Sequence, residues 1–72
     1  MAIETSSLAV GKCYVTAAEQ VRKVLEIDGD RVKYVSRGRT ETPHWERGLW
    51  QWTERTAFAA EVDREVAYDW QA

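Results

Sequence analysis

Residues able to perform chemistry are scarce in this chain of 72 amino acids, which holds one histidine and one cysteine. Nucleophilic catalysis needs a nucleophile, a base and a group that orients the base. The histidine, His44, lies between Pro43 and Trp45 in a polar stretch and has no evident partner. Cys13 alternates with Val15 in a strand-like segment, which is typical of a buried and inert thiol. These residues favour a protein that is not an enzyme.

The sequence also offers little for metal binding or acid–base catalysis. A structural zinc site needs four Cys or His ligands and a catalytic one needs three, so one of each does not suffice. Asp28-Gly29-Asp30 has the turn of a calcium loop without its downstream ligands. Glu61 and Glu65 are spaced to pair as acid and base on a helix, but a solvated helix face explains them better. We expect neither a metal nor another cofactor.

Aromatic residues form the one constellation with a sharper functional interpretation. Two or three aromatics at the rim of a small domain can enclose a cationic group, stack bases or grip a proline-rich peptide. The candidates are Tyr14, Tyr34, Trp45, Trp50 and Trp52. Alternatively, Tyr34, Trp50 and Trp52 fill the core, because so short a chain has few other large side chains.

Trp45 differs from the other aromatics because it lies in a polar loop, residues 37–48, with no periodicity to draw it inward. Exposed tryptophan is enriched at interaction hot spots, although Trp45 could instead pin the loop to the domain. Arg37 and Arg39 begin the same loop. With the basic residues of the preceding hairpin they could form a phosphate-binding patch, which the net charge of −2 and Glu26 oppose.

The central element that must position these residues is a hairpin. Two strand-like runs, residues 21–27 and 30–36, flank Asp28-Gly29, the strongest short-range hairpin signal. A type I′ loop at Asp28-Gly29 predicts cross-strand pairs between Ile27 and Asp30, Leu25 and Val32, and Lys23 and Tyr34. One face would carry Val21, Leu25, Ile27, Val32 and Tyr34. The other would carry Arg22, Glu26, Arg31 and Lys33 together with Val24 and Val35.

The remaining segments complete a single small domain. Residues 1–7 read as a flexible leader, residues 8–66 as the folded unit with a first strand within 8–16, and residues 67–72 as a tail that folds back through Tyr68 and Trp70. Residues 49–53 alternate as a strand whose core face carries Trp50 and Trp52. From residue 56, Phe58, Val62 and Val66 recur every four positions, which predicts an amphipathic helix of about ten residues docked on the sheet.

The spacing Gly11-x-x-Tyr14, Val21-x-x-Val24-Leu25, Gly29-x-x-Val32-x-Tyr34, then Trp50 and Phe58, resembles that of SH3-like small barrels of the Tudor and KOW types. It is also similar to short bacterial domains of unknown function. The resemblance covers residues 10–62. It implies a mainly β fold, a partly open barrel of four or five antiparallel strands with one C-terminal helix. Tudor-like barrels bind peptides with methylated Lys or Arg, and KOW-like barrels bind RNA or protein.

The expected function is that of a non-catalytic module that binds a protein or peptide through the loop 37–48 and the adjacent rim. The expected contact residues are Trp45, Arg37, Arg39, Tyr14 and Tyr34. One alternative is RNA or single-stranded DNA binding by the basic hairpin face. Another is a structural or oligomerisation role in which Trp50 and Trp52 face a second copy. A single cysteine, no signal-peptide pattern and no apolar run of about 20 residues favour the cytoplasm and no membrane partner.

Overall fold

The computed structural model describes residues 3–38 and 50–71. Within these ranges, five antiparallel strands form one open sheet in the order β4-β3-β2-β1-β5. The strands are β1 (Cys13–Thr16), β2 (Val21–Asp28), β3 (Arg31–Arg37), β4 (Gln51–Glu54) and β5 (Val62–Val66). A 3-10 turn, η1 (Thr5–Ser7), precedes β1, and the helix α1 (Arg55–Glu61) joins β4 to β5. The predicted mainly β class, with one helix in the C-terminal part of the chain, is confirmed.

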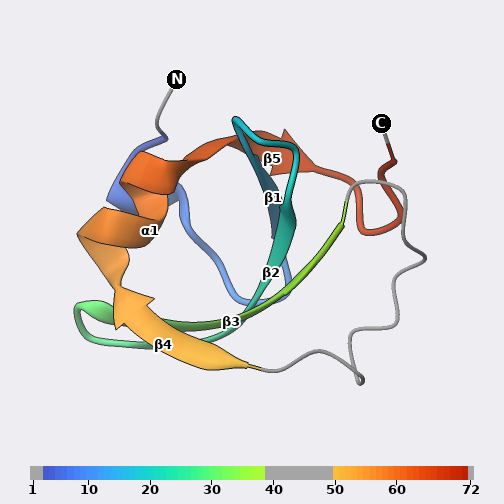
Figure 1. Cartoon of the computed structure of the whole chain (residues 1–72). Helices are drawn as coiled ribbons and strands as arrows, with labels where there is room; N and C mark the ends of the chain where they lie inside the picture. The colour runs from blue at the N-terminus through green and yellow to red at the C-terminus, as the bar shows by residue number, and fades with distance from the viewer. Residues whose placement is uncertain (1–2, 39–49, 72) are drawn as a thin grey trace.

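The sheet curves strongly, and α1 extends from the β4 end toward the β5 end (Figure 1). This arrangement is compatible with a small barrel-like fold. The guanidinium group of Arg55 fastens the start of the helix, because Nε donates to Thr5 O at 3.2 Å and Nη1 to Gly29 O at 3.3 Å. In the described part of the chain, no helix is long and apolar enough to cross a membrane.

The hairpin forms as predicted, but its register differs. Asp28 pairs with Arg31, so the two-residue loop is Gly29-Asp30 and not Asp28-Gly29. Gly29 has a φ of 62°, whereas the φ of Asp30 is not positive. A type I′ turn needs positive φ at both loop positions, whereas a type II′ turn needs it at the first, where glycine is preferred. The predicted type I′ loop is therefore wrong.

A β-bulge at Leu25 shifts the hairpin register a second time. Val24 pairs with Tyr34 and Glu26 with Lys33, so Leu25 has no opposite residue. The extra residue reverses the side-chain alternation along β2. Val24, which the predicted register placed on the polar face, is buried against α1, whereas Leu25 packs on the opposite face of the sheet.

Buried side chains form one cluster on each face of the sheet. The helix-side core lies under α1 and contains Leu8, Tyr14, Val24, Val32, Tyr34, Phe58, Ala59 and Val62. The second cluster contains Cys13, Val15, Val21 and Val35, and Trp70 of the C-terminal tail packs against it. Ile3, within the predicted leader, packs on the helix-side core, and its N–H donates to Ala59 O at 3.3 Å.

The helix is shorter than predicted because the chain turns into β5 at Val62. Val62 and Val66 are four residues apart, a spacing that fits one face of a helix. In the structure an irregularity in the β1–β5 pairing places them on opposite faces of the sheet, Val62 in the helix-side core and Val66 against the second cluster. Both residues pair with β1, Val62 opposite Thr16 and Val66 opposite Cys13. The free edge of β1 provides backbone hydrogen-bond partners along this segment, and β-branched valines suit a strand. The predicted helical role of Val62 and Val66 is wrong.

Candidate functional site

Of the five residues predicted to form a binding rim, the structure describes Tyr14, Tyr34 and Arg37. Trp45 and Arg39 lie outside the described residues. Tyr14 is 1% exposed and Tyr34 is 7% exposed, and both rings meet the ring of Phe58 edge-on, with centroid separations of 5.9 Å and 5.1 Å. The Tyr14 hydroxyl accepts from Ala9 N–H at 3.1 Å, and it donates to a backbone carbonyl of η1. Both tyrosines therefore contribute to the helix-side core.

Arg37 is buried, with 7% of its surface exposed. Its Nη2 donates to Trp70 O at 2.6 Å and to Tyr68 O at 3.2 Å, and its Nη1 donates to Gly38 O at 3.1 Å. A guanidinium group presents several donors in a fixed plane, so one side chain can bond several carbonyls at once. Arg37 thus anchors the C-terminal tail to the end of β3.

Trp52 of β4 and Trp50, which directly precedes β4, both lie outside the two buried clusters. Trp52 pairs with Lys33, whereas Thr53 and Gln51 pair with the core residues Val32 and Tyr34. Residues that are paired across antiparallel strands point to the same face, so Trp50 and Trp52 lie opposite the helix-side core. Trp50 is 57% exposed and Trp52 is half-buried. The predicted core role of this tryptophan pair is wrong.

Two cations of β3 rest on the rings of these tryptophans. Lys33 Nζ lies 4.2 Å from the centroid of the Trp50 ring, and Arg31 Cζ lies 5.5 Å from that of Trp52. We name these four residues, Arg31, Lys33, Trp50 and Trp52, the tryptophan face. Cation–π attraction at exposed sites is worth about 0.5–1 kcal/mol, which favours this layered arrangement without burying the rings.

Acidic residues border the tryptophan face. Glu54 is the cross-strand partner of Arg31 on β4, and Glu26 is that of Lys33 on β2. Both glutamates are exposed. The two glutamates therefore balance the charges of Arg31 and Lys33. Only the two cations lie over the aromatic rings.

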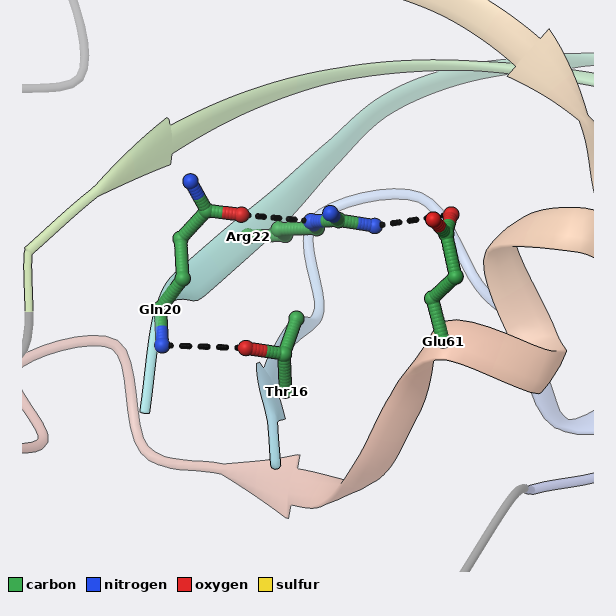
Figure 2. A network of polar contacts seen from close by, with 4 residues as sticks. All are labelled: Thr16, Gln20, Arg22 and Glu61. Carbon is green, nitrogen blue, oxygen red and sulfur yellow. Dashed lines mark hydrogen bonds and ion pairs between the residues drawn. The ribbon is translucent and has the colours of Figure 1, made fainter. Parts of the chain in front are cut away.

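A shallow cleft of about 410 Å³ lies between the β1–β2 turn and the C-terminal end of α1. Figure 2 shows its polar network, in which Arg22 lies between Gln20 and Glu61. Arg22 Nε donates to Gln20 Oε1 at 2.9 Å, and Nη1 donates to Glu61 Oε1 at 3.2 Å. The guanidinium carbon also lies 4.9 Å from the Tyr34 ring centroid.

The cleft network stabilises the junction between helix and sheet. An acidic side chain in the last turn of a helix is repelled by the partial negative charge at the helix end. The ion pair with Arg22 offsets this repulsion at Glu61. The Arg22 side chain is 13% exposed, whereas that of Glu61 is 55% exposed. Since one partner is largely solvated, the pair contributes at most about 1 kcal/mol.

The described residues hold no group of three or more His, Cys, Asp or Glu side chains placed to bind a metal ion. Cys13 is 2% exposed, and burial raises the pKa of its thiol above the ordinary value despite nearby Lys23 and Arg37. A raised pKa disfavours the thiolate, which is the reactive form of cysteine.

No protein family model, no curated protein and no solved structure matches this chain. Among the described residues, the tryptophan face is the surface whose composition most resembles that of a binding site. Its sequence signal was the alternation Trp50-Gln51-Trp52, which indicates that the two rings share a face. The alternation does not tell which face is buried, because that depends on the pairing of β4 with β3.

Proposed function

We propose that this protein is a non-catalytic binding module that holds another protein or a peptide against the tryptophan face. The observation that supports this most is the 57% exposure of Trp50 beside Trp52 and two cations. Tryptophan and arginine are the residue types most enriched at binding hot spots. Covering about 100 Å² of exposed indole contributes roughly 2.5 kcal/mol to binding.

The proposal includes two finer points from the sequence. The strand order and curvature are compatible with an SH3-like barrel, and the resemblance to Tudor and KOW barrels also favours a binding role. The single cysteine favours the reducing environment of the cytoplasm. A contribution of Trp45 and Arg39 from the loop 37–48 stays a prediction.

The test compares Trp50→Ala with Val10→Ala as baits in affinity capture from the native cell. Val10 is a matched control because it is 60% exposed and lies in a turn apart from the tryptophan face. We expect a partner that the wild type and Val10→Ala retain and Trp50→Ala loses at least tenfold, with rebinding by the purified partner. Equal retention by both variants would contradict the proposal.

The second candidate function is binding of single-stranded nucleic acid. It is favoured by the positions of Arg31 and Lys33 over the tryptophan rings, because single-strand sites combine aromatic stacking with cations for the phosphates. It predicts salt-sensitive binding of an RNA or DNA oligonucleotide that Lys33→Glu abolishes, measured by fluorescence anisotropy. Absence of binding at low salt would dismiss it.

A further inference from the structure

The strand β4, which contains Trp52 and directly follows Trp50, lies at an edge of the sheet. β4 pairs with β3 on one side, and no described segment pairs with its other side. Every second residue of an antiparallel edge strand directs its N–H and C=O away from its neighbour. The outer edge of β4 therefore presents backbone groups that can form a ladder with another strand.

The two edges of the sheet differ in how they are protected. The middle of β5 consists of three charged residues, Asp63, Arg64 and Glu65, and such charges are a common means of preventing a strand from pairing with other chains. The Arg64 guanidinium also lies 5.5 Å from the ring of Trp70 in the tail. β4 has Gln51, Trp52 and Thr53 before its terminal Glu54, so its first three positions have no such protection.

The chemistry beside the β4 edge indicates the charge of a partner strand. Arg31 and Lys33 belong to β3, but their charged groups lie over the rings of Trp52 in β4 and of Trp50 directly before it, and therefore extend toward the open edge. A strand added to β4 would lie about 4.8 Å away, with alternate side chains beside those rings. Glu26 lies on the β2 side, away from this edge, and Glu54 occupies only the last position of β4, opposite Arg31.

We propose that β4 accepts an extended peptide as a sixth strand, and that this peptide has acidic side chains at alternate positions. Backbone hydrogen bonds to β4 would provide affinity, and carboxylates beside Trp50 and Trp52 would meet Lys33 and Arg31. The inference rests on the proposed function, because it names the partner class for the tryptophan face.

The first experiment titrates the isotope-labelled protein with an eight-residue peptide of alternating threonine and glutamate, followed by two-dimensional NMR of amides and indoles. A peptide of alternating threonine and lysine is the matched control. We expect at least tenfold tighter binding of the glutamate peptide, with the largest shifts in β4 and weakening by salt. Equal binding of the two peptides would overturn the acidic partner.

The second experiment separates strand addition from side-chain contact. Two further glutamate peptides are N-methylated, one at odd and the other at even positions. A strand pairs through one edge, so one methylated peptide should lose binding at least tenfold while the other keeps it. If both methylated peptides bind the protein equally well, and both lose binding to Trp50→Ala, strand addition is overturned. The proposed function would remain intact.

Other occupants of this edge have recognisable outcomes. A mass that doubles with concentration in the micromolar range, and is monomeric in Trp50→Ala, would assign the β4 edge to a second copy of this chain. Displacement of the glutamate peptide by a tighter-binding oligonucleotide would assign the face to nucleic acid. Either result would overturn the peptide inference.

Loss of peptide binding in Lys33→Glu but not in Arg64→Glu would support the peptide inference, since Arg64 lies on the opposite edge.

Discussion

The two faces of this sheet each combine a cation with aromatic rings, but with opposite exposure. On the helix side, the guanidinium carbon of Arg22 lies 4.9 Å from the Tyr34 ring centroid and 5.8 Å from that of Phe58, and both rings belong to the buried helix-side core. On the other face, Lys33 lies over the exposed ring of Trp50 and Arg31 over the half-buried ring of Trp52. The same kind of contact stabilises the fold where a helix covers it and remains available for binding where none does.

The largest difference in stability between the two faces is expected at Phe58, which is completely buried in the helix-side core. Truncating a buried phenylalanine costs about 3–5 kcal/mol in free energy of unfolding, which approaches the whole stability of so small a domain. We expect Phe58→Ala to be largely unfolded, as measured by urea denaturation and circular dichroism. Trp50→Ala is the control and should lose no more than about 0.5 kcal/mol, because its ring is exposed. A similar loss in both variants would mean that the two faces do not differ.

Tyr14→Phe tests a single polar contact of the helix-side core. The change leaves the N–H of Ala9 without its acceptor, which costs about 1–3 kcal/mol. The measurement is the denaturant midpoint at neutral pH. An unchanged midpoint would show that the hydroxyl does not stabilise the turn before β1.

The pH dependence of stability extends this test. Burial raises the pKa of Tyr14 and of Cys13 above their ordinary values of 10.0 and 9.0. The folded state therefore holds these protons more firmly than the unfolded state. The resulting stabilisation is fully present below the ordinary pKa and is lost as the pH rises through the raised pKa of the folded state. We expect the free energy of unfolding to fall above about pH 9. The decline should be shallower in Tyr14→Phe and in Cys13→Ala, and an identical slope in all three proteins would contradict the assignment.

The smallest effect is expected at the cleft. Glu61→Gln keeps an oxygen that can accept from Arg22 while it removes a negative charge from the end of α1. Loss of a half-solvated ion pair and relief at the helix end oppose each other, so the free energy of unfolding should change by less than about 0.5 kcal/mol. A loss of more than about 1 kcal/mol in thermal denaturation would make this pair a principal tie between helix and sheet.

Sequence reasoning located the hairpin, the mainly β class and the strand of tryptophans, because Asp-Gly turns and period-two alternation are local signals. It misplaced the end of the helix, since the spacing of Phe58, Val62 and Val66 fits a helix as well as the observed turn into a strand. The sequence did not indicate that Tyr14, Tyr34 and Arg37 are buried, because aromatic and basic residue types are compatible with both a surface and a core position. The candidate face was thus visible as a pattern but not as a surface.

The sequence by itself determined that the hairpin and the segment around Trp52 are extended and that the two tryptophans share a side. The tertiary structure alone decided which side is buried. A shift of one residue in strand pairing exchanges the two faces of a strand. Here the loop at Gly29-Asp30, the bulge at Leu25 and the pairing of Trp52 with Lys33 set that register. These choices follow from packing Val24, Val32 and Phe58 together, a long-range requirement that no local pattern contains.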